Sequence, residues 1–394
     1  MNNNTDNLYP CRVVVIVPVY RNLEVTRNCL ESLMASDLPE HATIIVIDDN
    51  SPEDAVSAYC QELTKRFDLQ LVVNDKNLGF VRTVNKGFSL NTDADIILLN
   101  SDTVVSNDWV QRLQACAYRE PNIGTVTPFS NNGTICSYPV FLIPNRIPNQ
   151  WNARELDRAF QSGNSESHCE IPTAVGFCMY IKRSCLNATG AFDEEAFGQG
   201  YGEECDFSLR ASAKGWKHVI AADIFVYHEG AASFASESTE RKRRADTIMD
   251  TLHPSYHTLI GDFIARDPLY FLRKNVDAIR LNKKPADVTN ILEEHFRYTK
   301  TILERVRNEQ EQRQQLETQR QQLETQQQQL EIMLTITREQ FTETDSALNH
   351  AQALVTGLNS DLKQSQAHSA QLDDVILNME QSRSWRYTAW LRKK

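Results

Sequence analysis

The sequence lacks any apolar run long enough to cross a bilayer. The longest early run, VVVIVPV at 13–19, is far shorter than the roughly 20 residues that a membrane-spanning helix needs. The first ten residues, MNNNTDNLYP, are polar and contain no apolar stretch of signal-peptide length. We therefore expect a soluble, non-exported protein in the cytoplasm.

Paired cysteines are also missing. The chain has 9 cysteines, an odd number, and none of them forms a CxxC pair. All of them lie at or before Cys205. Isolated cysteines in a chain without an export signal are typical of reduced, structural thiols. The sequence thus argues against a disulfide framework and against a zinc site.

Excess positive charge is a third absence. The 394 residues carry 41 Lys and Arg against 52 Asp and Glu, which gives a net charge of −11. A negative total argues against broad, sequence-independent binding of nucleic acid, so we expect no nucleic-acid partner. With 41% hydrophobic residues, the chain has enough apolar material for a sizeable core.

Proline and glycine almost disappear after Pro285. All 13 prolines and all but one of the 14 glycines lie within residues 1–285, the exception being Gly357. Turn-forming residues therefore punctuate only the first part of the chain. This predicts a polar tail at 1–10, a compact domain at 11–285, and a long helical region at 286–381 that is followed by a tail at 382–394.

The helical region contains a seven-residue repeat. RQQLETQ occurs at 313–319 and again at 320–326, and QQQLEIM follows at 327–333. Leu316, Leu323 and Leu330 recur every seven residues. After a step of four residues the same period continues with Leu334, Phe341 and Leu348. The pattern predicts a coiled coil that joins copies of the chain into a homo-oligomer. A solvated, partly frayed, Gln-rich helix is the alternative.

The last thirteen residues, SRSWRYTAWLRKK, combine aromatic and cationic side chains. Trp385, Tyr387 and Trp390 stand among five Lys and Arg residues. Such a segment can lie on an anionic membrane surface, which would make the protein peripheral on the inner face of the cytoplasmic membrane. A helix end that docks on a neighbouring domain explains the same pattern.

The sequence of the first domain predicts alternating strands and helices. Apolar, β-branched runs at 13–17, 43–47, 69–73 and 95–99 alternate with helical spacing at 23–35, 53–67 and 81–90. This order predicts an α/β fold with a mostly parallel sheet and helices on both faces. Ligands of such sheets bind outside the carboxyl ends of the strands.

All four of these strand ends are polar, and three carry acids. The segments are PVYRN at 18–22, DDNS at 48–51, NDKNLGF at 74–80 and NSDT at 100–103, and none is a Walker A or GxGxxG motif. A phosphate ligand could be held here through a divalent cation, since Mg²⁺ and Mn²⁺ prefer oxygen ligands. Turn formation and helix capping are the competing explanation for such Asx residues.

Four segments, in this order, resemble the family 2 nucleotide-sugar glycosyltransferases, rhamnosyltransferase-like members included. They are VVVIVPVYRN with IIVIDDNS, NLGFVRTVNKGF with ADIILLNSDT, the stretch from Gly176 to Trp216, and VYHEGAAS at 226–233. The resemblance covers about residues 11–235 and implies the GT-A fold, a Rossmann-like mixed sheet flanked by helices. It implies a nucleotide-binding half at about 11–105, an acceptor and catalytic half at about 106–235, and a helical extension at 236–285.

The resemblance also implies which residues bind the donor. Asp49 would bond the pyrimidine base, and Asp102 would bind the metal that holds the diphosphate. Asn100 stands where many relatives have the first Asp of a DxD element. The remaining expected nucleotide and donor contacts are Pro18, Val19, Tyr20, Asn77, Gly79 and Asn85.

On the acceptor side, the resemblance places Gly176, Phe177 and Glu203. It makes Glu204 the general base, although many relatives have Asp at that position, and it makes His228 a second metal ligand beside Asp102. The chemistry agrees, because a sugar hydroxyl is a poor nucleophile until a positioned carboxylate takes its proton. Ordinary capping by acids in the first turn of a helix is the alternative for the Glu203–Glu204 pair.

Together these features predict a Mn²⁺- or Mg²⁺-dependent inverting glycosyltransferase. It would move a sugar from a UDP- or dTDP-linked donor to a hydroxyl of a glycan or lipid-linked glycan, in synthesis of bacterial surface polysaccharide such as O-antigen or capsule. Two other classes compete: a non-catalytic nucleotide-binding scaffold that acts through its coiled coil, and a nucleotidyltransferase. The chain could also be one module of a longer system.

Overall fold

The computed structural model describes residues 12–198, 200–230, 235–340 and 345–381. The chain divides into two compact units, the first being Met1–Leu259 with Pro268–Phe296 and the second Ile260–Asp267 with Arg297–Lys394. The predicted tails at 1–10 and 382–394 lie outside the described residues, as do Trp385, Tyr387 and Trp390.

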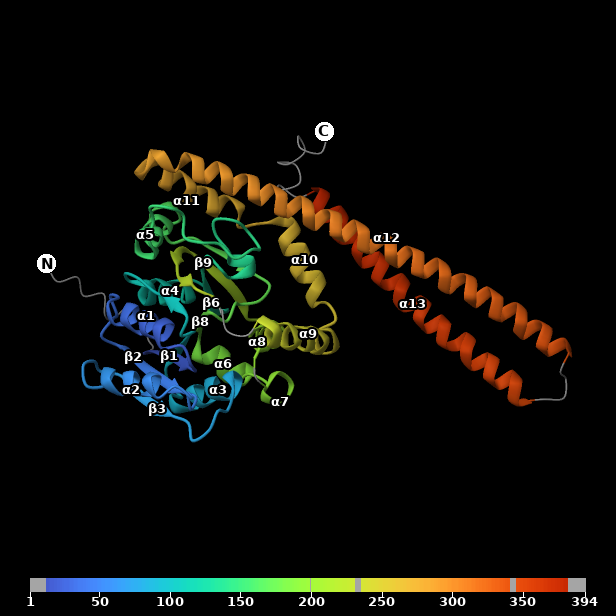
Figure 1. Cartoon of the computed structure of the whole chain (residues 1–394), viewed down its shortest axis with the longest axis horizontal. Helices are drawn as coiled ribbons and strands as arrows, with labels where there is room; N and C mark the ends of the chain where they lie inside the picture. Colours follow the sequence, from blue (N-terminus) through green and yellow to red (C-terminus); the bar gives the residue numbers. More distant parts are fainter. Residues whose placement is uncertain (1–11, 199, 231–234, 341–344, 382–394) are drawn as a thin grey trace. The chain divides into compact units, whose positions relative to one another are not determined.

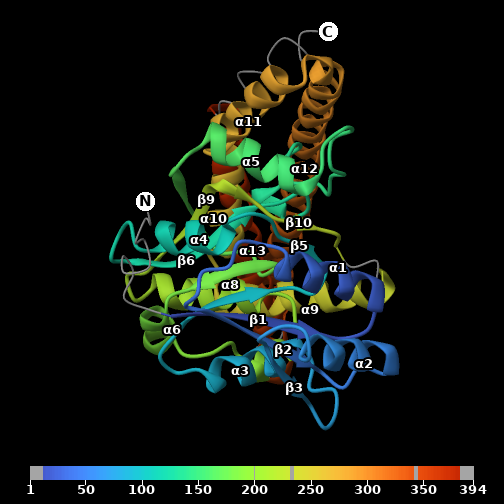
Figure 2. The same ribbon diagram turned by 90° about the vertical axis from the view of Figure 1, so that its left-hand side faces the viewer.

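The first unit is built on an eight-stranded mixed sheet with the order β3-β2-β1-β4-β8-β6-β9-β7 (Figure 1, Figure 2). Strands β1 to β4, β6 and β9 run in one direction, whereas β8 and β7 are antiparallel to their neighbours. The strands are β1 (Val13–Val19), β2 (Ala42–Asp48), β3 (Gln70–Val73), β4 (Asp95–Leu99), β6 (Ile123–Phe129), β7 (His168–Ile171), β8 (Cys178–Ile181) and β9 (Lys217–Phe225). The predicted α/β class with a mixed, mostly parallel sheet is confirmed.

Helices flank this sheet. The helices between β1 and β9 are α1 (Leu23–Met34), α2 (Asp54–Leu63), α3 (Phe80–Leu90), α4 (Trp109–Ala117), α5 (Ala153–Gly163), α6 (Arg183–Thr189), α7 (Glu194–Phe197) and α8 (Glu203–Ser212), with the 3₁₀ helix η1 (Thr134–Cys136). On one face, Ile16 of β1 and Ile47 of β2 pack with Val84 of α3 and Phe207 of α8 in a fully buried core. Alternate strand residues reach opposite faces, so the continuous apolar run of β1 is buried on both sides.

A second, two-stranded sheet lies at the carboxyl edge of the first. It pairs β5 (Thr103–Val104) with β10 (Tyr227–His228) in antiparallel fashion, and His228 lies opposite Thr103. The backbone nitrogen of Glu229 also donates to the carbonyl of Asp102 at 2.9 Å. This short ribbon brings two segments together that are more than a hundred residues apart in sequence.

The helices that follow the sheet are α9 (Ala235–Leu252), α10 (Tyr256–Arg266), α11 (Tyr270–Lys283) and η2 (Pro285–Asp287), followed by the first turns of α12 (Val288–Gln340). Within the first unit, a buried ion cluster joins α11, η2 and the first turns of α12. Arg280, which is fully buried, donates to Asp287 at 2.7 Å and to both oxygens of Glu294 at 2.7 and 3.0 Å. Tyr138 joins the cluster through its hydroxyl. Breaking one partner would leave an uncompensated buried charge.

The second unit pairs α12 with α13 (Asp345–Gln381), two helices that lie side by side in Figure 1. Arg313 of α12 forms an ion pair with Asp373 of α13. The repeat leucines of α12, Leu316, Leu323 and Leu330, are half-buried. The residues three positions before them are polar and also half-buried; they are Arg313, Arg320 and Gln327. The long predicted helix is therefore present, and within one chain its heptad seam faces a second helix.

Helix α13 has a heptad pattern of its own. Eight of its half-buried or buried residues recur at alternating spacings of three and four; they are Val355, Leu358, Leu362, Ser365, Ser369, Leu372, Ile376 and Met379. The predicted continuation of the α12 period runs through Leu334, Phe341 and Leu348, whose side chains lie outside the described residues. Association between copies of the chain stays a prediction.

Across the described part of the chain, no helix is both long and apolar enough to cross a membrane.

Candidate active site

The donor side of the carboxyl edge is organised by Asp49, directly after β2. Its side chain is buried, and its two oxygens accept bonds from Asn74 Nδ2 at 2.8 Å, from the Leu78 nitrogen at 2.8 Å and from the Gly79 nitrogen at 2.9 Å. The carboxylate therefore builds the loop from Asn74 to Gly79. Its predicted contact with a pyrimidine base stays a prediction.

Two other predicted donor residues also take part in local structure. Asn77 Oδ1 accepts from the Gly79 nitrogen at 2.9 Å, and Gly79 itself has a φ of +82° just before α3. That left-handed conformation favours glycine, so the loop can turn directly into the helix. Asn85 of α3 points elsewhere: its amide bonds Phe192 and Glu194 and so fastens the segment before α7 to α3.

The predicted donor contacts at the end of β1 differ in exposure. Pro18 and Val19 are buried within the strand, whereas Tyr20, just beyond it, is 38% exposed. The guanidinium of Arg21 lies 5.0 Å from the centroid of the Tyr20 ring. Of these three predicted donor contacts, Tyr20 is the one that offers an accessible surface.

Asn100 and Asp102 follow β4 in a tight turn. The turn is held by a bond from the Asn100 nitrogen to the Phe177 carbonyl at 2.9 Å and by one from Thr103 Oγ1 to the Asn100 carbonyl at 2.7 Å. The side-chain oxygen of Asn100 is buried and has no hydrogen-bond partner. A buried acceptor without a partner costs free energy, and such atoms in native structures are often completed by an ion or ligand.

Asp102 and His228 lie together, as the resemblance implies. His228 Nε2 is 3.3 Å from Asp102 Oδ2, and His228 Nδ1 lies 2.6 Å from the carbonyl oxygen of Asn132. Because a carbonyl only accepts, Nδ1 carries a proton and Nε2 is the nitrogen that faces Asp102. Burial acts to lower the pKa of His228, but the hydrogen bond and charge of Asp102 outweigh it and raise that pKa.

Phe177 and Gly176 connect this pair to the acidic residues at the start of α8. The Phe177 ring stacks on the His228 ring with a centroid distance of 5.2 Å and an angle of 16°. A Cβ placed on Gly176 would lie 3.6 to 3.7 Å from the side-chain carbons of Glu204. Two adjacent residues therefore contact both Glu204 and His228, and their place on the acceptor side stays a prediction.

Glu203 and Glu204 form the first turn of α8. Glu203 is 5% exposed, and its Oε2 is buried without a hydrogen-bond partner. Burial raises the pKa of Glu203 well above its usual range, and the charge of Glu204 adds to the effect. Burial likewise raises the pKa of Glu204, which suits a group that must accept a proton near neutral pH. Capping alone does not require a buried carboxylate oxygen without a partner.

His253, just after α9, and Tyr256, at the start of α10, support this turn. His253 Nε2 lies 2.9 Å from Asp206 Oδ1, and the Tyr256 hydroxyl lies 3.3 Å from Cys205 Sγ. The two contacted residues directly follow Glu204 in α8. No sequence signal pointed to them, since a lone His and a lone Tyr fifty residues downstream carry no spacing pattern.

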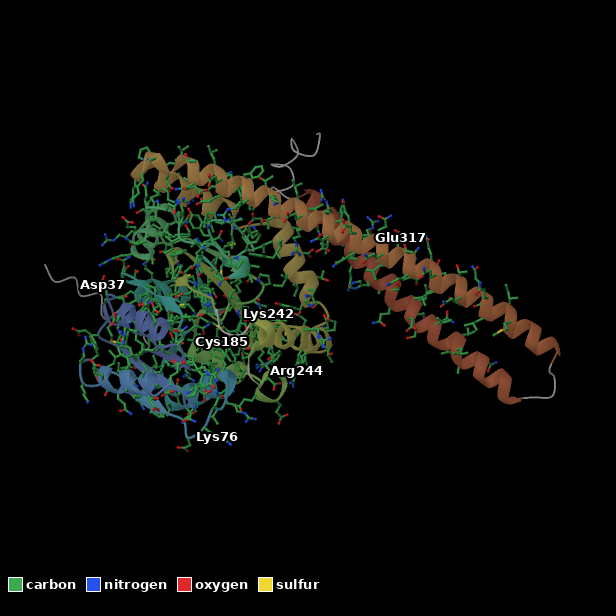
Figure 3. All side chains as sticks on the ribbon, viewed as in Figure 1. Asp37, Lys76, Cys185, Lys242, Arg244 and Glu317 are labelled. Atoms are coloured by element: carbon green, nitrogen blue, oxygen red, sulfur yellow. The ribbon has the colours of Figure 1, made fainter. Side chains whose placement is uncertain are left out.

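The basic run at 241–244 lies on α9. Figure 3 shows Lys242 and Arg244 on this helix, and Lys242 Nζ lies 5.5 Å from the Tyr201 ring centroid. Tyr201 belongs to the glycine-rich loop that leads into Glu203, and it has a φ of +71°. Lys242 thus packs against that loop.

The site contains donors that suit a hard divalent cation. Asp102 supplies a carboxylate, and His228 supplies Nε2 because its Nδ1 bonds the Asn132 carbonyl. Asn100, two residues before Asp102, has a buried Oδ1 without a hydrogen-bond partner. A His ligand whose other nitrogen bonds a carbonyl is the usual arrangement in metal sites. Across the described residues, no cluster of three or more His, Cys, Asp or Glu side chains is grouped to hold a metal. Asp102 and His228 thus form a pair that suits a metal ion whose remaining coordination positions are filled by a bound substrate or water.

The model of the family described as glycosyltransferase-like family 2 matches residues 10–247, more than half of the chain. The chain belongs to this family. Asp49, Asp102, Glu203, Glu204 and His228 all lie within the matched range.

Three curated relatives are similar to this family 2 chain. Glycosyltransferase AglE of Haloferax volcanii is 24% identical over 218 residues, 55% of this chain and 66% of the relative. An N-acetylglucosaminyltransferase of Azorhizobium caulinodans is 36% identical over 29% of each chain. The O-antigen biosynthesis protein RfbC of Myxococcus xanthus is 25% identical over 61% of this chain and 18% of its own. The chain thus spans less than two thirds of these relatives.

Among solved structures, GalNAc-T7 with UDP, GalNAc and Mn²⁺ aligns at 13% identity over 71% of this chain and 57% of its own, with a TM-score of 0.48. A mannosyltransferase from Pyrobaculum calidifontis, in complex with GDP-Man and Mn²⁺, aligns at 13% identity over 94% of this chain and 88% of its own, with a TM-score of 0.44. Both scores are too low to support an argument about this family 2 chain.

Proposed function

We propose that this protein is a metal-dependent inverting glycosyltransferase that moves a sugar from a UDP- or dTDP-sugar to a glycan hydroxyl. The observation that carries the proposal is the bridge at 176–177. It places Glu204 beside Gly176 and stacks Phe177 on His228, which pairs with Asp102. A proton acceptor and a candidate diphosphate anchor are therefore fixed by adjacent residues of one segment.

In the proposed reaction, Glu204 takes the proton of the acceptor hydroxyl as its oxygen bonds the anomeric carbon. The bond from that carbon to the diphosphate breaks, and its electron pair leaves with the diphosphate. The raised pKa of Glu204 makes it a stronger base than an exposed glutamate. Gly176 leaves room beside this carboxylate for the acceptor, since any larger residue would meet the Glu204 side chain.

Asp102 and His228 are the residues that would hold Mn²⁺ or Mg²⁺, with Asn100 nearby. When bound, such an ion would stabilise negative charge on the leaving diphosphate. Phe177 and Asn132 fix the His228 ring so that Nε2 faces the Asp102 carboxylate. Asp49 supports the donor side by holding the loop that ends at Gly79.

A role in bacterial surface polysaccharide synthesis is consistent with the name of the RfbC relative, an O-antigen biosynthesis protein. The acceptor would then be a glycan or a lipid-linked glycan. Oligomer formation through the α12 repeat, contact of the 382–394 tail with the cytoplasmic membrane, and membership of a larger system remain predictions beside this one.

Thermal unfolding with a panel of nucleotide sugars, in Mn²⁺ and in EDTA, tests the proposal. A ligand at about 100 times its dissociation constant adds roughly 2.7 kcal/mol to the free energy of unfolding. We expect one UDP- or dTDP-sugar to raise the melting temperature only with metal present. Glycosyl transfer to an acceptor should then follow and should be lost in Glu204→Gln.

A non-catalytic scaffold is the competing function. It predicts nucleotide binding without turnover, and a Glu204→Gln variant that behaves like the wild type. The buried, unpartnered oxygen of Glu203 supports a working site, because a scaffold that only binds nucleotide gains nothing from its cost on the predicted acceptor side.

A further inference from the structure

Asn131 lies two residues after the end of β6 and is 3% exposed. Its side chain bonds both backbone groups of His228: the His228 nitrogen donates to Oδ1 at 2.7 Å, and Nδ2 donates to the His228 carbonyl at 2.9 Å. One side-chain amide thus takes the place that a neighbouring strand would occupy. His228 is paired with β5 on one side and with Asn131 on the other.

Asn132, the next residue, fixes the orientation of the His228 ring. The carbonyl oxygen of Asn132 accepts a hydrogen bond from His228 Nδ1 at 2.6 Å. Because Asn131 and Asn132 are adjacent, the clamp on the His228 backbone and the partner of its imidazole move together. A shift of the Asn131 peptide would change both the position of His228 and the tautomer of its ring.

Asn131 is itself held rigidly. Its carbonyl accepts from the Asn145 nitrogen at 2.9 Å, and its Nδ2 donates to the Asn145 carbonyl at 3.0 Å. Asn145 Nδ2 in turn bonds the carbonyls of Val140 and Ile143, both at 2.8 Å. Hydrogen bonds within the segment 130–145 therefore hold Asn131 and Asn132 in place, and these two residues in turn hold His228.

We infer that Asn131 is a positioning residue that fixes His228 Nε2 toward Asp102 and so sets the affinity of the site for a divalent cation. The inference rests on the proposed role of Asp102 and His228 as metal ligands. Partners behind a ligating His typically change metal affinity by roughly 10- to 100-fold when they are removed. For Asn131→Ala we expect about a tenfold weaker affinity.

Mn²⁺ titration of the full chain, followed by electron paramagnetic resonance, measures this affinity. Asn164→Ala is the matched control: Asn164 is also 3% exposed, and its Nδ2 bonds the carbonyls of Ala222 and Leu272 at 3.1 and 3.0 Å, but no hydrogen bond joins it to His228. We expect Asn131→Ala to weaken Mn²⁺ binding and Asn164→Ala to leave it unchanged. An unchanged affinity in Asn131→Ala overturns the inference.

A double-variant cycle identifies the route of the effect. If Asn131 acts through His228, its removal costs affinity in the wild type and nothing further in a His228→Ala background. A full additional loss in that background would mean that Asn131 acts by another path, and the inference would be wrong.

Nitrogen NMR of the imidazoles, without metal, gives a second and independent readout. The His228 signal is assigned by its loss in His228→Ala. At alkaline pH, where the imidazole is neutral, we expect the Nδ1-protonated tautomer in the wild type and a mixture of tautomers in Asn131→Ala or, if that variant fails to fold, in Asn131→Ser. An unchanged tautomer in the variant contradicts the inference. If the wild type binds no Mn²⁺ but the tautomer responds, the proposed metal role fails and the positioning by Asn131 stands.

Discussion

Two carboxylates at the same edge of the sheet are treated in opposite ways by the fold. Asp49 is buried, and its oxygens accept three hydrogen bonds from the chain around it. Glu203 is equally buried, but its Oε2 has no partner, and burial raises its pKa. The first carboxylate is used to build a loop. The second keeps an oxygen free at an energetic cost, which is typical of groups that meet a ligand.

The sharpest test of this comparison concerns the neighbour of Glu203. Glu204→Gln removes the proposed base while keeping its shape, so we expect the turnover rate to fall by about 10²- to 10⁴-fold. Donor binding, measured by thermal stabilisation, should be retained. Glu195→Gln on α7, an exposed acid outside the site, is the control and should leave the rate unchanged. A rate within twofold of the wild type would remove Glu204 from the mechanism.

Asp49→Asn should be the most destabilising single change in the comparison. An amide offers one acceptor oxygen where the carboxylate offers two, so at least one backbone donor of Leu78 or Gly79 loses its partner. Hydrogen bonds to charged groups are worth roughly 1.5–3 kcal/mol, so we expect a loss of about 2 kcal/mol in urea unfolding. The exposed Asp54→Asn serves as control. Unchanged stability would mean that the loop does not depend on this carboxylate.

Glu203→Gln should stabilise the protein at neutral and alkaline pH, and this gain should be smaller than the loss expected for Asp49→Asn. The folded protein raises the pKa of Glu203, so it binds the proton more tightly than the unfolded chain, and wild-type stability falls as pH rises from about 4.3 through the raised pKa. The neutral amide escapes this loss. We expect melting temperatures that coincide near pH 4 and a variant that is more stable by a few degrees at pH 8. A constant difference across that range would rule out the titration of Glu203 as its cause.

Gly176→Ala should be the mildest change in stability. Its added Cβ would lie 3.6 to 3.7 Å from Glu204, which is ordinary contact, so the free energy of unfolding should change by less than about 0.5 kcal/mol. The methyl group occupies space that the acceptor needs beside Glu204. Steady-state kinetics should therefore give a raised KM for the acceptor with an unchanged KM for the donor. Equal changes in both would place Gly176 outside the acceptor side.

Much of the sheet could be predicted because its strands are continuous apolar runs. The predicted strand at 95–99 agrees with β4, and that at 13–17 falls within β1, which extends to Val19. The ribbon of β5 and β10 could not be found in this way. Each strand has two residues, and its pairing depends on a contact between Thr103 and His228 that no local periodicity encodes.

Within the site, the sequence was most informative where motifs are compact. Asp102, Glu203, Glu204 and His228 were named from short segments, and the structure brings Asp102 to His228 and Gly176 to Glu204. Asn85 was grouped with the donor residues, whereas its amide fastens α3 to the segment before α7. Asn131 was missed, although it follows a strand as the other polar residues of this edge do.

The sequence alone determined the elements and the chemistry available. Apolar runs fix where strands form, the loss of proline and glycine after Pro285 permits helices as long as α12, and the acids after β2 and β4 supply the charges. Only the tertiary structure decided which carboxylates are satisfied and which are kept without a partner. That distinction arises from hydrogen bonds between segments far apart in the chain, such as those from Asn131 to His228, and burial gives these bonds their weight.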